Sequence, residues 1–173
     1  ADGAVIAFGD DGDITMTHVA DQGLDIKHAN TGDDKFATIT LQTGDTNIAV
    51  DDVLGRINFQ APSEAAGSDS IAVAAGIEAV SEGDFSATNN ATKLVFKTAA
   101  SEVALSKMTL SSAGILNLSA TTASSSAATG ALTVDGGAGV LLDLSVGDDV
   151  RLISDAAVLS FGADSDVTLT HVA

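Results

Sequence analysis

Hydrophobic and polar residues alternate along most of the chain with a period of two. The stretch ITMTHV at residues 14–19 places Ile14, Met16 and His18 on one side of an extended chain. Since successive side chains of a β-strand point to opposite faces, this period is typical of strands and not of helices. Turns rich in Asp and Gly, such as residues 21–23 and 135–137, separate the alternating runs. The pattern predicts an all-β protein.

The alternating runs are short. They cover residues 14–19, 24–28, 36–41, 47–50, 55–60, 71–80, 93–98, 107–110, 115–119, 131–134, 142–146, 150–154, 158–161 and 167–172. Residues 71–82 are rich in alanine, which makes a helix the alternative there, but the strict alternation favours a strand. We therefore expect many brief strands joined by tight turns.

A segment near the start of the sequence is repeated near its end. Residues 4–20 read AVIAFGDDGDITMTHVA and residues 157–173 read AVLSFGADSDVTLTHVA, with eleven of seventeen positions identical. The substitutions at Ile14, which corresponds to Val167, and at Met16, which corresponds to Leu169, keep the apolar pattern. Such self-similarity is typical of repetitive architectures. We expect a window cut from a longer repetitive protein, which begins inside one unit and ends inside the next.

The composition predicts a thin structure. The chain has 173 residues with no Trp, no Tyr, no Cys and six Phe, so few large side chains are available to fill a deep core. Exposed sheet edges of such a chain are protected when identical chains associate. We therefore expect an elongated fibrous array of short strands, a β-helix- or β-prism-like shaft, formed by an intertwined homotrimer or by stacked repeats.

Shifts in composition divide the chain into four parts. We expect a β-repeat segment at residues 1–52, a β module at 53–118, a Ser/Thr/Ala linker at 119–130 and a shaft repeat at 131–173, whose end duplicates residues 4–20. The linker contains no bulky side chain, which is typical of an extended connection.

Two of these parts resemble the fibrous tail and appendage proteins of bacteriophages, particularly marine ones. The sequences GRINFQA (55–61), AGIEAV (75–80), KLVFKT (93–98) and KMTLSSAGILNL (107–118) are similar to the module that precedes the C-terminal chaperone of tail fibres. Residues 121–152 resemble a shaft repeat with a Ser/Thr tract, a TGAL strand and a GG-G turn. The motifs depart from the family at residues 113–118, which read AGILNL instead of GNVGIG, and at Leu144, which replaces an aromatic residue.

The resemblance implies a structural protein of a virion or of the extracellular space. It would space or present a host-attachment element, and the host cell surface would be contacted by other segments of the parent protein. A tandem-repeat adhesin or self-assembling extracellular filament subunit of a prokaryote is the alternative. A polysaccharide-degrading tailspike is a third interpretation.

The charge argues against two kinds of partner. With 7 basic and 24 acidic residues the formal net charge is −17, and this repels nucleic acid and anionic lipid. No apolar run reaches the length of about 18 residues that a spanning helix needs. We expect neither nucleic-acid binding nor membrane insertion.

Catalytic motifs do not stand out. The sequence contains neither G-x-S-x-G nor S-x-x-K, and it has no cysteine that could act as a nucleophile. We expect no enzymatic activity and no cofactor.

The histidines and clustered aspartates are the only candidates for metal ligands. Among them are His18, His28, His171, Asp11 and Asp13, and the aspartate clusters are at residues 10–13, 33–34, 51–52, 148–149 and 164–166. Imidazole and carboxylate groups can bind metals, and paired carboxylates could hold calcium, but their spacing matches no established motif. Histidines that form hydrogen bonds and solvated turn aspartates are the alternative that we favour.

Residues of the repeated segment are expected at the junctions between copies. These residues are Phe8, Ile14, Met16, His18, Phe161, Val167, Leu169 and His171. Three basic residues, Arg56, Lys93 and Lys97, could form a patch for an acidic ligand, but the acidic excess favours pairing with neighbouring Asp and Glu.

Overall fold

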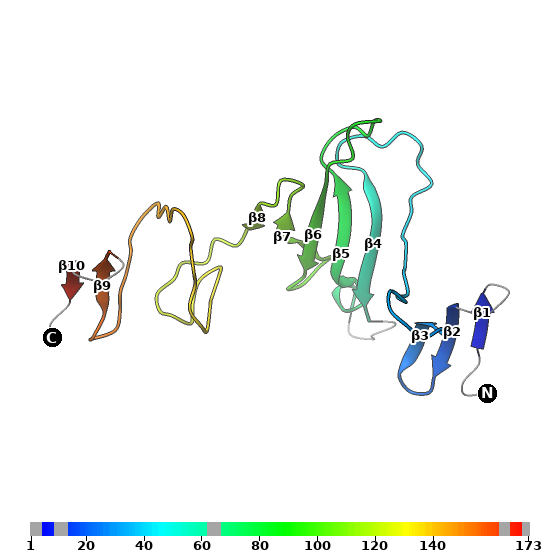
Figure 1. Ribbon diagram of the computed structural model, residues 1–173, viewed down its shortest axis with the longest axis horizontal. Helices are drawn as coiled ribbons and strands as arrows, with labels where there is room; N and C mark the ends of the chain where they lie inside the picture. The colour runs from blue at the N-terminus through cyan, green and yellow to red at the C-terminus, as the bar shows by residue number, and fades with distance from the viewer. Residues whose placement is uncertain (1–4, 9–13, 62–66, 163–166, 171–173) are drawn as a thin grey trace.

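The computed structural model describes residues 5–8, 14–61, 67–162 and 167–170 (Figure 1). Within these ranges ten strands form three separate sheets, and every strand pair is antiparallel. The one helical element among the described residues is a single 3-10 turn, Asp69–Ile71. The predicted all-β class is confirmed.

The first sheet has the order β1-β2-β3. Its strands are β1 (Val5–Phe8), β2 (Ile14–Val19) and β3 (Gly23–His28). The turn between β2 and β3 places Asp21 at φ 58° and Gly23 at φ 130°. Only glycine adopts the latter conformation without strain, which fixes the start of β3.

The second sheet is a five-stranded meander. It contains β4 (Val53–Gln60), β5 (Val73–Ser81), β6 (Thr92–Thr98), β7 (Leu105–Leu110) and β8 (Leu116–Leu118), in that order. These strands begin at Val53 and end at Leu118, the same bounds as those of the β module expected from the sequence. The predicted strand at 71–80 is confirmed as β5, and the helix alternative is wrong apart from the 3-10 turn that precedes it.

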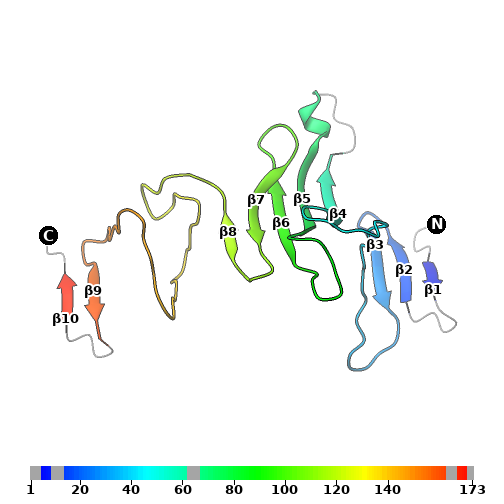
Figure 2. The same ribbon diagram turned by 90° about the horizontal axis from the view of Figure 1, so that it is seen from above.

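The third sheet is a hairpin of β9 (Val158–Phe161) and β10 (Val167–Thr170). The three sheets follow one another in chain order along the long axis, with β1 to β3 at one end and β9 and β10 at the other (Figures 1 and 2). The fibrous shaft and the homotrimer are properties of an assembly and stay predictions.

Very little of the chain is buried. Among the described residues the buried apolar side chains are Val80, Val95 and Ala104, and Ser81 is the buried polar one. The Ser81 hydroxyl donates to the carbonyl of Ala49 and accepts a hydrogen bond from the backbone N–H of Asp52 at 3.0 Å. This small core ties the loop before β4 to the end of β5.

Five predicted strands are absent. Residues 36–41, 47–50, 131–134, 142–146 and 150–154 are irregular or form turns, so these predictions are wrong for the single chain. A strand needs a hydrogen-bonded neighbour, and these runs have no pairing partner among the described residues. Their large side chains stay in solvent, with Leu142 at 87% exposure, except for Ile48, which is half-buried.

The expected linker at 119–130 is irregular, and the irregular backbone continues to the start of β9. Within it, residues 125–129 form a local turn in which the hydroxyl of Thr129 accepts from the N–H groups of Ser125 and Ser126. The described residues contain no helix with the length and apolar character needed to cross a membrane.

Candidate functional site

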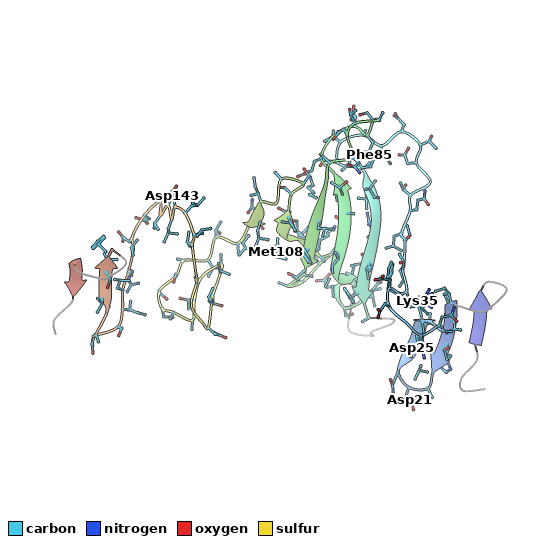
Figure 3. All side chains as sticks on the ribbon, in the orientation of Figure 1. Asp21, Asp25, Lys35, Phe85, Met108 and Asp143 are labelled. Carbon is cyan, nitrogen blue, oxygen red and sulfur yellow. The ribbon has the colours of Figure 1, made fainter. Side chains whose placement is uncertain are left out.

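One face of the five-stranded sheet is apolar from edge to edge. Residues opposite each other on neighbouring antiparallel strands share a face, so the register defines rows across the sheet. One row runs Ile57, Ile77, Phe96, Met108 and Leu118. A second runs Gly55, Ala79, Leu94, Leu110 and Leu116, and a third runs Phe59, Ala75, Thr98 and Leu105. Figure 3 marks Met108 on β7, within the first row.

This face, which we call the apolar sheet face, lies in solvent. Seven of its large side chains are between 37% and 62% exposed; they are Ile57, Phe59, Ile77, Leu94, Leu105, Leu110 and Leu116. A fully exposed side chain of this size offers roughly 150–200 Å² of surface. At the exposed fractions given above, the seven side chains together present an area on the order of 600 Å². That is at the upper end of the apolar patches found on monomeric proteins, where patches of such size often mark interaction sites.

The segment before β4 covers one end of the apolar sheet face. Leu41 lies against Gly55, so closely that a Cβ built on Gly55 would stand 2.7 Å from the Cβ of Leu41. Leu41, Ile57, Ile77 and Leu94 line a shallow hollow of about 280 Å³ at this end. The absence of a side chain at Gly55 therefore makes room for Leu41.

The opposite face of the same sheet carries charge. Glu78 on β5 forms an ion pair with Arg56 on β4, in which Nε lies 3.6 Å from Oε2. It forms a second ion pair with Lys97 on β6, in which Nζ lies 3.2 Å from Oε1. The Glu78 side chain is 12% exposed, so two cations neutralise a largely covered carboxylate. The sheet is amphipathic, with an apolar face and an ion-paired face.

Lys93 forms a third ion pair, with its Nζ 2.9 Å from Oδ1 of Asp51. Each of the three basic residues singled out in the sequence thus pairs with an acidic neighbour. The prediction of ion pairing for Arg56, Lys93 and Lys97 is confirmed.

One carboxylate at the end of the sheet is perturbed. Ser112 donates hydrogen bonds to the Glu82 carboxylate from its side chain and from its backbone N–H, the latter at 2.8 Å. These hydrogen bonds hold the pKa of Glu82 below its ordinary value of 4.5, and the charge of Lys93 also lowers it. The contact fastens the turn after β7 to the end of β5.

Those candidate metal ligands that the structure describes do not lie close to one another. His18 pairs with Leu24 and His28 pairs with Ile14, so the two histidines stand four positions apart on neighbouring strands, about 13 Å along the strand direction. A shared zinc ion requires both ring nitrogens within about 2 Å of the metal. Asp11, Asp13 and His171 lie outside the described residues. Among those described, no group of three or more His, Asp or Glu could hold a metal ion.

The expected junction residues occupy equivalent places in two hairpins. Phe8 pairs with Ile14 in the first, and Phe161 pairs with Val167 in the second. Met16 and Leu169 are the corresponding central positions of β2 and β10. His18 is exposed on β2, and Phe161 is 52% exposed on β9.

Sequence reasoning missed the apolar sheet face. Part of its signal is present, since Ile57 and Phe59 on β4, Leu94 and Phe96 on β6, Met108 and Leu110 on β7, and Leu116 and Leu118 on β8 are large apolar residues two positions apart. The alternation of one strand does not reveal which residues of the next strand lie opposite it. Only the register aligns these positions into continuous rows.

Comparison with known proteins provides no relative. No family model, curated protein sequence or solved structure matches the chain.

Proposed function

We propose that this chain is a non-enzymatic structural segment of a viral tail fibre or virion appendage, which associates with copies of itself. In this role it spaces or presents a host-attachment element that is located in other segments of the parent protein. The observation that carries the proposal is the apolar sheet face, which a single chain leaves in water.

The area of the face fits association between copies. When two copies pack through it, each removes on the order of 600 Å², so the total reaches about 1,200 Å², the lower bound of specific stable interfaces. The opposite face contributes ion pairs within the chain and no comparable apolar area. Association through one face leaves the charged face in solvent, where a net charge of −17 keeps the assembly dispersed.

A homotrimer is the form that we propose for the assembly. Three chains arranged about one axis can each turn the apolar sheet face inward, so that its exposed apolar side chains form a core shared between the chains. The resemblance of residues 55–118 and 121–152 to phage fibre sequences supports this form. It also supports an extracellular location on a virion.

The test is sedimentation of the full chain at micromolar concentration. We expect a trimer, and we expect Ile57→Lys to shift the protein toward monomer because it places an ammonium group in the middle row of the apolar sheet face, on the edge strand β4. Asn58→Lys is the matched control, since the neighbouring residue of the same strand is exposed on the other face and should leave the trimer intact. A wild-type chain that sediments as a folded monomer would contradict the proposal.

A second candidate function is a tandem-repeat surface adhesin or filament subunit. One observation favours it: β1 with β2, and β9 with β10, form hairpins with the same register, as a stacked array of units would require. The neighbouring genes separate the two functions. Phage structural genes support the fibre, whereas a secretion and cell-wall anchoring apparatus supports the adhesin.

A further inference from the structure

A hollow opens on the ion-paired face of the five-stranded sheet, beside Glu78. Gly76 forms its floor, since it lies two positions from Glu78 on β5 and therefore faces the same side. Asn58 on β4 and Lys97 on β6 lie directly opposite Gly76 in the register and flank the hollow. A side chain on residue 76 would narrow this space, because a Cβ built on Gly76 would stand 3.2 Å from Oδ1 of Asn58. The glycine therefore keeps the hollow open.

Backbone hydrogen bonds fix a third side of the hollow. The loop between β6 and β7 returns to the start of β5, where the N–H of Ala104 donates to the carbonyl of Val73 at 2.8 Å and the N–H of Ala99 donates to the carbonyl of Ala74 at 2.9 Å. Val73 and Val103 line this side with apolar side chains. The hollow measures about 50 Å³, which leaves room for one small polar group and excludes a complete ring.

The hollow carries an excess of positive charge. Arg56 and Lys97 both line it, and both pair with the single carboxylate of Glu78. Within the described ranges no second acidic group forms an ion pair with either cation. A guanidinium and an ammonium together offer about eight N–H donors, whereas one carboxylate offers about four acceptor sites. Since the Arg56 side chain is 51% exposed, its remaining donors can reach an anion from solvent.

We infer that this hollow binds the carboxylate of a sugar acid of the uronate class. The carboxylate enters the hollow, where Lys97 and Arg56 donate charge-assisted hydrogen bonds to it. The ring stays outside, where the exposed amide of Asn58 offers a donor and an acceptor to the ring hydroxyl next to the carboxylate-bearing carbon. An aspartate side chain has no such hydroxyl. This ligand is additional to the spacing role proposed above, and the site lies on the face opposite the apolar sheet face.

An NMR titration of the isotope-labelled full-length chain with sodium glucuronate tests the site. We expect saturable shifts of the amide signals of Asn58, Gly76 and Lys97. We expect a dissociation constant at least about tenfold lower than that for glucose, because glucose has the ring but no charged acceptor for the two cations. Sodium chloride at the same ionic strength is the blank. Equal binding of glucose, or no saturable shift at these three residues, would overturn the inference.

Two variants remove different parts of the site. Lys97→Gln removes a cation and Gly76→Ala narrows the hollow, and each should weaken glucuronate binding by about tenfold or more. Lys93→Gln is the matched control, since it removes the same charge from the same strand but Lys93 pairs with Asp51 away from the hollow. Its effect should stay below about twofold. Equal weakening by Lys97→Gln and Lys93→Gln would reveal a general effect of charge and would overturn the site, whether or not Gly76→Ala folds.

A comparison of ligands tests the sugar acid. Acetate and N-acetyl-aspartate amide carry the carboxylate without the neighbouring hydroxyl, and we expect both to bind about threefold or more weakly than glucuronate. Equal affinity of N-acetyl-aspartate amide would overturn the sugar acid in favour of an acidic peptide. Ile57→Lys, which disrupts the apolar sheet face, should leave glucuronate binding unchanged. Failure of the trimer and failure of this site are therefore distinguishable.

Discussion

Leu41 occupies the space that a side chain at Gly55 would fill. The Cβ atom of an alanine at position 55 would lie 2.7 Å from the Leu41 Cβ and 3.3 Å from the Leu41 carbonyl oxygen. Contacts this short involve backbone as well as side chain, so the strand and the segment before it cannot both keep their positions. The pairing of this glycine with this leucine places an irregular segment on the apolar sheet face.

Gly55→Ala is therefore expected to displace Leu41 and to lower the free energy of unfolding by about 1–3 kcal/mol. The change is measured by urea denaturation together with the methyl NMR signals of Leu41, which should lose their contacts with β4. Gly44→Ala is the control, since nothing lies within 4 Å of its added Cβ. Equal stability of the two variants would show that the close approach is not required.

Ser81→Ala tests the small core. The substitution removes the hydroxyl that bridges the carbonyl of Ala49 and the N–H of Asp52, and it leaves both backbone groups without that partner. A cost of about 1–3 kcal/mol is expected in thermal or urea denaturation, because unsatisfied buried groups lose hydration without compensation. Ser70→Ala, which removes a hydroxyl from an exposed hydrogen bond to Gly67, should cost less than half as much.

Glu78→Gln tests the ion-paired face. It removes the negative charge shared by Arg56 and Lys97, and we expect a loss of about 1 kcal/mol at low salt. Asp51→Asn is the matched control, since Asp51 is 73% exposed and its pair with Lys93 should contribute almost nothing. In 1 M NaCl the difference between the variants should shrink, and a loss that does not depend on salt would argue against an electrostatic origin.

The carboxyl of Glu82 gives a prediction for the effect of pH. Its pKa in the folded chain is lowered by Ser112, so folding favours the ionised form. This contribution to stability is fully present above the ordinary pKa of 4.5, and it is lost as the pH falls through the lower pKa of the folded state. Ser112→Ala should move the pKa of Glu82 upward in a carboxyl-detected NMR titration. Ser111→Ala should not, because the hydroxyl of Ser111 accepts from Ile115 instead.

Much of the fold was predictable from alternation alone. The runs that became β2 to β10 have both the pattern and an antiparallel partner that is next to them in chain order. Residues 142–146 have a similar pattern but no pairing partner in the described chain, and Leu142 and Leu144 stay exposed. The period of a sequence shows which side chains share a face of a strand, whereas strand pairing depends on which other segment of the protein lies beside that strand.

The candidate site was predictable only in part. The opposite charges of Arg56, Lys97 and the surrounding acids were enough to predict ion pairs, because long side chains reach their partners across a strand or two. The rows that contain Ile57, Ile77 and Phe96 depend on the register, including the irregularities between Val53 and Gly55 and between Phe96 and Lys97. A bulge shifts the alternation by one residue, and local sequence does not locate it.

Because the five-stranded sheet has one apolar and one ion-paired face, temperature should affect association of copies and folding of the sheet differently. In the proposed assembly, burial of the apolar sheet face between copies carries a negative heat capacity change, so the driving force for association weakens on cooling. The ion pairs around Glu78 lie within one chain and do not share this dependence. Chilling the assembly toward the freezing point should therefore separate the copies while each five-stranded sheet stays folded.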